Sequence, residues 1–256
     1  MSTVKEELYN FLINEAEHPF MGWNFSYIKD RIVYDVLPWS YTSKIIPFIR
    51  RSIALLDIGT GGGEFLSSLI PLPKKARATE AYLPNLSMAK KILKLLGVKV
   101  YFLADKGKLP FETNEFDLII NRHEFYDLNE VFRVLKMGGT FINQQVGDRN
   151  DKKLRLILAG TENLEDDTEW NLNYAIQDLD NKGFNIIEKN EMINNTRIFD
   201  VGAIVYYLKI ISGEIPDFTV QKYFDKLWEI HKQIAKNNYI ELNNNNHRFL
   251  IVAKKN

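Results

Sequence analysis

The sequence contains no cysteine among its 256 residues. A chain without thiols can form neither disulfide bonds nor cysteine-ligated zinc sites, and it offers no thiolate nucleophile. The histidines are scattered, without a His/carboxylate grouping at metal-ligand spacing. We therefore predict that the protein binds no metal and works in the reducing cytoplasm.

Excess charge and long apolar runs are missing as well. The 33 lysines and arginines balance the 33 aspartates and glutamates, whereas dedicated nucleic-acid binders usually carry a basic surplus. No segment reaches the roughly 18 apolar residues that a membrane span requires, and the charged N-terminus lacks the apolar core of a signal peptide. We predict no membrane span, and we disfavour nucleic acid as a partner without excluding a local basic patch.

What is present is the composition and pattern of an α/β domain. Hydrophobic residues make up 45% of the sequence and charged residues 26%, which is ordinary for a globular domain. From Ser52 onward, short apolar runs alternate with amphipathic stretches, a pattern typical of βαβ units and a parallel sheet. Residues 53–58 are apolar on both faces until the end of the run, where Asp57 stands, as expected for a central strand. Further strands are predicted at residues 76–79, 99–104, 116–120, 140–146, 184–192 and 248–253.

We expect residues 1–256 to form a single domain with four parts. The parts are an aromatic-rich N-terminal segment (1–50), a core (51–192), a helical insertion (193–247) and the last strand (248–256). The N-terminal segment is predicted to be helical, and it either packs on the edge of the sheet or closes over a ligand as a lid. The one low-complexity run, Asn243–Asn246, predicts a turn or loop.

The strongest local signal is the glycine-rich segment 57–64, which follows the first predicted strand. Glycines at such a strand-to-helix turn let a ligand approach the backbone, and the turn presents free N–H groups. Gly59 and Gly61 match the first two glycines of the dinucleotide fingerprint, but Glu64 stands at the third position. Asp57 would repel a pyrophosphate and suits a ligand with positive charge. The segment therefore disfavours an NAD-linked oxidoreductase.

Two further carboxylates stand where predicted strands end. Glu80 ends the second strand, where an acidic side chain can accept hydrogen bonds from ribose hydroxyls. Asp105 closes the third strand, where it could accept a hydrogen bond from an adenine amino group. Ligands of open α/β sheets bind along the carboxyl ends of the strands. Asp57, Glu80 and Asp105 together therefore predict a nucleoside site at this edge.

These features resemble, in order and spacing, the motifs of class I S-adenosylmethionine (SAM)-dependent methyltransferases, in the branch that includes the ubiquinone/menaquinone-biosynthesis type. The matching segments are 57–63, Glu80, 104–111, 116–120 and 130–139. The resemblance implies a Rossmann-like three-layer sandwich, with a seven-stranded, mostly parallel sheet whose last strand is antiparallel. It also implies SAM as the methyl donor and S-adenosylhomocysteine as the product.

The resemblance implies roles for individual residues. The residues expected around SAM are Asp57, Gly59, Thr60, Gly61, Glu80, Ala81, Asp105, Lys106, Asn121 and Tyr41. Asp57, Gly59 and Gly61 would hold the methionine moiety. Glu80 would hold the ribose, and Asp105 with its neighbours the adenine.

Residues 121–124 (Asn-Arg-His-Glu) end the fourth predicted strand, where this family usually places side chains that face the transferable methyl group. His123 has an ordinary pKa that suits proton removal near neutrality. It is predicted either as a general base for the acceptor, or as a residue that only lines the pocket or caps a helix. Both alternatives stay open, because alignment of an activated methyl group supplies much of the acceleration by itself.

The predicted function is transfer of a methyl group from SAM to a small-molecule acceptor, by a monomer or homodimer. One alternative is an RNA methyltransferase. The balanced charge and the absence of an Asn-Pro-Pro-Tyr-like motif after the fourth strand disfavour it. A second alternative is a binding module that keeps the SAM fold without catalysis, which an occluded acceptor cavity would favour.

Overall fold

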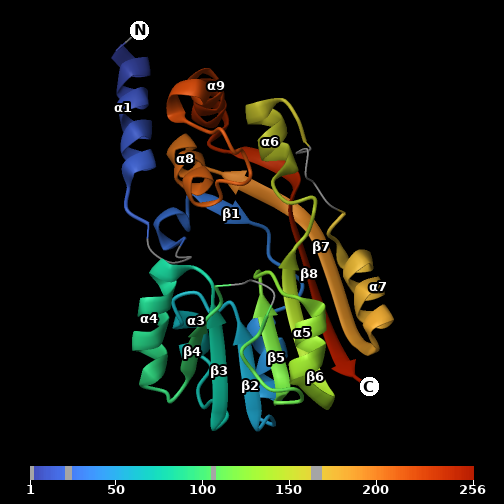
Figure 1. The fold of residues 1–256 in the computed structure, drawn as a ribbon. Coiled ribbons are helices and arrows are strands. Elements are labelled where there is room, and N and C mark those ends of the chain that lie inside the picture. The colour runs from blue at the N-terminus through green and yellow to red at the C-terminus, as the bar shows by residue number, and fades with distance from the viewer. Residues whose placement is uncertain (1–2, 21–24, 105–107, 163–168) are drawn as a thin grey trace.

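The computed structural model describes residues 3–20, 25–104, 108–162 and 169–256. Within these residues, one sheet contains eight strands (Figure 1). Their order across the sheet is β1-β7-β8-β6-β5-β2-β3-β4. The strands are β1 (Ile32–Tyr34), β2 (Ala54–Ile58), β3 (Lys75–Glu80), β4 (Lys99–Phe102), β5 (Phe116–Arg122), β6 (Leu135–Val146), β7 (Phe184–Ile198) and β8 (Ile240–Lys255). The helices are α1 (Thr3–Glu17), α2 (Tyr41–Ile49), α3 (Glu64–Ser67), α4 (Leu83–Lys94), α5 (Leu128–Val134), α6 (Lys152–Ala159), α7 (Leu172–Lys182), α8 (Val201–Ile210) and α9 (Val220–Asn237), with a 3-10 turn at Ser26–Ile28.

β2 lies at the centre of the parallel part of the sheet, between β3 and β5. All five of its residues are buried, as its apolar sequence predicts for a strand covered on both faces. The carboxylate of Asp117 on β5 fixes the start of β2. It accepts hydrogen bonds from the backbone N–H groups of Ile53, at 3.0 Å, and Ala54, at 3.2 Å.

Helices cover both faces of this part of the sheet. Ile45 of α2 and Ala89 of α4 pack in the hydrophobic core on one face. Val131 of α5 and Leu179 of α7 pack in the core on the other face. The arrangement confirms the predicted three-layer, Rossmann-like sandwich. No helix in the described part of the chain has both the length and the apolarity needed to cross a bilayer.

The other end of the sheet is antiparallel. β8 runs antiparallel to both β6 and β7, which confirms the predicted orientation of the last strand. The predicted count of seven strands is wrong by one, because β1 pairs with the end of β7, where Ile32 lies opposite Ile198. β1 has only three residues, too few for an apolar periodicity to stand out in the aromatic N-terminal segment.

β7 and β8 extend well beyond the bounds that their apolar residues predict. They stay paired as far as Ile198 and Ile240, so the helical part of the insertion lies only between these residues. The run Asn243–Asn246, predicted as a turn or loop, belongs to β8. Its buried amides are satisfied by side chains: Asn246 Nδ2 donates to Asn194 Oδ1 at 2.6 Å. Polar residues can therefore continue this strand inside the protein.

The extended ends of β7 and β8 carry a third hydrophobic core. This upper core contains side chains from α1, α6, α8 and α9, including Leu12, Leu154, Ile204 and Leu227. Figure 1 shows α1, α8 and α9 together at the top of the view, whereas β2, β3 and β4 lie at the bottom. The first fifty residues are thus divided: α1 belongs to the upper core, whereas α2 packs on the sheet.

Arg31 ties α1 to α8 in this upper part. Its guanidinium donates to Glu15 at 3.0 Å and to Asp200 at 2.6 Å. Glu15 is only 4% exposed. We expect Arg31→Met to lower the free energy of unfolding by about 3 kcal/mol, because it leaves Glu15 as a buried carboxylate without its cation.

Urea denaturation measures this loss. The matched control is Arg197→Met, because Arg197 pairs with Asp35 and Glu241 where all three side chains are about one third exposed. Such a surface network is expected to contribute below about 1 kcal/mol. Equal losses in the two variants would contradict the structural role of Arg31.

Candidate functional site

The glycine-rich segment forms a tight turn between β2 and α3. Gly59, Gly61 and Gly63 adopt left-handed φ angles of +73°, +62° and +91°, which glycine reaches without the strain that a side chain would add. The turn is fastened to β3, because the N–H of Gly59 donates to Thr79 Oγ1 at 3.3 Å and the N–H of Thr60 donates to the Thr79 carbonyl at 2.9 Å. The turn therefore has a fixed shape beside the end of β3.

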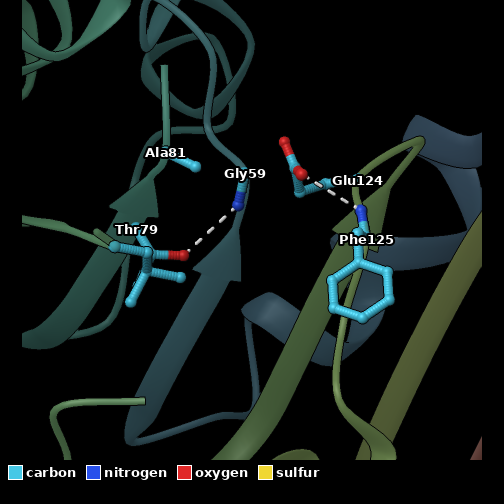
Figure 2. A pocket seen from close by; sticks show the side chains of 6 residues that line it. Gly59, Thr79, Ala81, Glu124 and Phe125 are labelled. Atoms are coloured by element: carbon cyan, nitrogen blue, oxygen red, sulfur yellow. Dashed lines mark hydrogen bonds between the residues drawn. The ribbon is translucent and has the colours of Figure 1, made fainter. Parts of the chain in front are cut away.

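A cavity opens in front of this turn, at the carboxyl ends of the parallel strands. Its lining residues are Gly59, Thr79, Ala81, Leu103, Glu124 and Phe125, and its volume is about 220 Å³, including space open to solvent. Figure 2 shows Gly59, Thr79 and Ala81 on one side of the cavity, with Glu124 and Phe125 facing them from the segment after β5. This is the edge where ligands of open α/β sheets bind.

Two carboxylates are buried beside the cavity. Asp57 is 5% exposed, and burial raises its pKa to about 6, although Thr60 and Arg122 oppose the rise. Glu80 is 2% exposed. Burial also raises its pKa, and the neighbouring Glu124 adds to this rise. A positively charged ligand would stabilise the ionised forms of these acids, so the electrostatics of the site favour a cation.

The Glu80 side chain is held in place by backbone groups. Its Oε1 accepts a hydrogen bond from the N–H of Tyr82 at 2.7 Å. The backbone N–H groups of Gly61 and Ala81 also stabilise its ionised form and so partly offset the rise of its pKa. The carboxylate thus connects the end of β3 with the glycine turn.

Asn121 connects the cavity to α2. Tyr41, at the start of α2, donates its hydroxyl hydrogen to the Asn121 carbonyl at 3.1 Å. The Asn121 Oδ1 accepts from Gln145 Nε2 at 2.8 Å and from the N–H of Glu124 at 3.3 Å. Asn121 Nδ2 is buried without a hydrogen-bond partner. A buried donor of this kind is costly unless a ligand satisfies it.

Thr60 also has a buried polar atom without a hydrogen-bond partner. Its hydroxyl lies close enough to Asp57 to lower the pKa of that acid, yet Thr60 Oγ1 makes no hydrogen bond of normal geometry and is buried. Thr60 and Asn121 therefore bring unsatisfied polar atoms to the region between β2 and β5. Within the described residues, no three histidine or carboxylate side chains gather in a way that could hold a metal ion.

The structure brings together most of the residues predicted around the cofactor. Those found at this edge of the sheet are Asp57, Gly59, Thr60, Gly61, Glu80, Ala81, Asn121 and Tyr41. Asp105 and Lys106 lie outside the described residues. Three residues that line the cavity were not predicted from the sequence, namely Thr79, Leu103 and Phe125, whereas Glu124 belongs to the predicted segment 121–124. Thr79 and Leu103 stand within two residues of strand-end acids, and this proximity is the signal that could have indicated them.

His123 lies directly after β5 in a left-handed conformation, with φ of +64°. Its Nε2 lies 3.2 Å from Gln144 Nε2. The Gln144 Oε1 accepts a hydrogen bond from Trp39 Nε1 at 2.9 Å, so the amide nitrogen of Gln144 faces the imidazole. Because an amide nitrogen can only donate, Nε2 of His123 accepts and its proton sits on Nδ1.

The environment of His123 keeps the imidazole neutral. Desolvation, followed by the positive charges of Arg248 and Arg122, lowers its pKa to about 3. A group with this pKa is unprotonated at pH 7 and is a weak proton acceptor. The environment of His123 therefore suits a neutral hydrogen-bonding group better than a base that takes up a proton.

Comparison with known proteins agrees with this geometry. Residues 56–143 match the family described as "Methyltransferase domain". A candidate methyltransferase from Bacillus halodurans C-125 has 17% identity and a TM-score of 0.57, over 85% of this chain and 99% of that one. A protein of unknown function from Deinococcus radiodurans R1 has 14% identity and a TM-score of 0.57, over 98% of each chain.

The (4+2)-cyclase SpnF shares the fold as well, with 14% identity and a TM-score of 0.53, over 97% of this chain and 94% of that one. None of the curated proteins matches the sequence. The strand order and the glycine turn define a Rossmann-like methyltransferase fold. Residues 56–143, which include the glycine turn, match a methyltransferase domain, and the solved structures share the fold of the chain.

Proposed function

We propose that the protein binds SAM in the cavity beside the glycine turn and transfers its methyl group to a small-molecule acceptor. The observation that carries this proposal is the buried pair Asp57 and Glu80, set on either side of a left-handed glycine turn. The pair supplies negative charge for a cationic ligand and acceptors for ribose hydroxyls. The unsatisfied atoms of Thr60 and Asn121 fit a ligand with polar groups at the same place.

Each residue has a distinct part in this proposal. Gly59 and Gly61 allow the methionine end of the ligand to approach the backbone. Asp57 accepts hydrogen bonds from the ammonium group, and Glu80 accepts them from the ribose. Ala81 and Leu103, which line the cavity, contact the adenine face.

When bound, SAM supplies a methyl group that its sulfonium activates. The protein then has to align the acceptor with that methyl group and exclude water, and such alignment can supply a large part of the acceleration. Asn121 and His123, at the end of β5, are placed to contribute to this alignment. We propose no proton transfer through His123, because its pKa is lowered to about 3.

Isothermal titration of the protein with SAM, S-adenosylhomocysteine and NAD tests the proposal. We expect both adenosyl ligands to bind with micromolar affinity and NAD not to bind. Glu80→Gln is expected to weaken SAM binding by at least about tenfold, because it removes charge-assisted hydrogen bonds to the ribose. Glu241→Gln is the matched control, because Glu241 is an exposed residue that pairs with Arg197 and does not line the cavity.

The outcomes separate the alternatives. Failure of folded protein to bind either adenosyl ligand would overturn the proposal. Binding without methyl transfer to any small molecule or RNA would favour the binding module. A transfer assay with radiolabelled SAM is required as well, because a shared fold does not fix the reaction, as the (4+2)-cyclase illustrates.

A further inference from the structure

Glu124 lines the cavity from the segment after β5, and its side chain reaches the glycine turn. Figure 2 shows this side chain facing Gly59 across the cavity. A Cβ added to Gly59 would meet three atoms of the Glu124 side chain, among them Oε2 at 3.0 Å. Glu124 therefore packs against the backbone of Gly59, with a carboxylate oxygen beside the turn.

The sheet holds Glu124 in this position. Its N–H donates to Oδ1 of Asn121, on β5, at 3.3 Å, and its carbonyl accepts a hydrogen bond from Nε2 of Gln145, on β6, at 3.0 Å. Its Oε1 accepts a hydrogen bond from the N–H of Phe125 at 3.1 Å. Two neighbouring strands thus fix the backbone from which the carboxylate enters the cavity.

Gly59 lies between the two buried acids of the site. It follows Asp57 by two residues, and its N–H donates to Oγ1 of Thr79, the residue before Glu80, at 3.3 Å. In the proposed function, Asp57 binds the ammonium group of SAM and Glu80 binds the ribose. The sulfonium joins the methionine chain to the ribose, so it lies between these two groups. Glu124, which faces Gly59, therefore faces the sulfonium.

The charge of Glu124 acts on the same site. It adds to the rise of the pKa of Glu80, so the two carboxylates are close enough to repel each other. A cation between them would offset this repulsion. The cavity has a volume of about 220 Å³, whereas ligand pockets usually have roughly 300 Å³ or more. A ligand that reaches Gly59 therefore comes into contact with the Glu124 side chain.

We propose that Glu124 distinguishes the methyl donor from the product, because its carboxylate attracts the sulfonium of SAM and not the uncharged thioether of S-adenosylhomocysteine. In the reaction, the methyl carbon forms a bond to the acceptor, and the electron pair of the broken C–S bond stays on sulfur. The positive charge that Glu124 faces is thereby lost. This inference rests on the proposed function, and it makes Glu124 a specificity-determining residue that favours replacement of the product by a new donor.

The test is calorimetric titration of Glu124→Gln and the unaltered protein with SAM and with S-adenosylhomocysteine. Glutamine keeps the size of the side chain and an acceptor for the N–H of Phe125, but it removes the charge. We expect Glu124→Gln to bind SAM at least about tenfold more weakly, and to change the affinity for S-adenosylhomocysteine by less than about twofold. Glu124→Asp keeps the charge and is expected to retain part of the preference for SAM.

Two other variants serve as references. Glu80→Gln is expected to weaken both ligands equally, because both contain the ribose, and Glu241→Gln is expected to weaken neither. Failure of the folded, unaltered protein to bind either ligand overturns the proposed function. If the unaltered protein binds both ligands, equal weakening of the two by Glu124→Gln, or no weakening of either, overturns the assignment of Glu124 alone.

Discussion

Replacing Asp57 by asparagine is expected to make the folded protein more stable at pH 8 and to remove most of its affinity for SAM. The two effects have opposite signs because burial of Asp57 opposes ionisation in the free protein, whereas a cationic ligand requires the ionised form. Burial raises the pKa of Asp57 from 3.8 to about 6. A shift of this size corresponds to about 3 kcal/mol.

The sign of the stability effect follows from the raised pKa. In the unaltered protein, the protonated Asp57 carboxyl contributes favourably to the free energy of unfolding. This contribution is fully present below pH 3.8 and is lost as the pH rises through about 6. The asparagine variant has no such loss. Its advantage in free energy of unfolding should therefore be largest above pH 6 and should disappear near pH 4. Urea denaturation of both proteins between pH 4 and pH 8 measures this difference.

The binding effect is measured by calorimetric titration at pH 8. Loss of one partner from a buried charge pair typically costs about 2 kcal/mol or more, so we expect Asp57→Asn to bind SAM at least about 30-fold more weakly. Asp180→Asn, on the exposed side of α7, serves as the control and should bind normally. If Asp57→Asn bound SAM with unaltered affinity, Asp57 would not be a ligand-binding group.

Gly59→Ala is expected to reduce SAM affinity by about 100-fold. An added Cβ at Gly59 would lie 2.3 Å from Glu124 Cγ, so Glu124 would have to move across the cavity that both residues line. The methyl group would also occupy the space through which the ligand approaches the backbone. The left-handed backbone adds a strain of about 1–2 kcal/mol.

Gly97→Ala serves as the control that separates the strain of the left-handed backbone from the contact between the added Cβ and Glu124. Gly97 has the same φ of +73°, but an added Cβ would meet no atom within 4 Å. Both alanine variants should therefore lose about 1–2 kcal/mol of stability through the backbone, whereas only Gly59→Ala should lose ligand affinity. Equal affinities in the two variants, measured by titration with S-adenosylhomocysteine, would rule out close approach of the ligand at Gly59.

The sequence was sufficient to predict the parallel part of the fold because local patterns determine it. The run that starts at residue 53 is apolar on both faces as far as Leu56, and the glycines that follow Ile58 are needed for left-handed angles in the structure. The buried position of Glu80 also follows from its place at a strand end. These features depend on near neighbours in the chain, so a single sequence reveals them.

The features that the sequence did not reveal depend on distant partners. The asparagines at 243–246 continue β8 because Asn194 and Asp151 satisfy their buried amides. Glu124 faces Gly59 because His123 turns the chain through a left-handed conformation. Arg248 is in register with Val146 and Met192 on the neighbouring strands. None of these relations leaves a periodic signal in the sequence.

The upper core is separate from the two cores that flank the parallel part of the sheet, and this separation has a consequence for how the protein can diversify. The match to the methyltransferase family ends at residue 143, whereas the upper core is assembled from α1, α6, α8 and α9, outside the matched residues. Substitutions or exchanges in the upper part are therefore expected to leave the side chains of the proposed donor site in place.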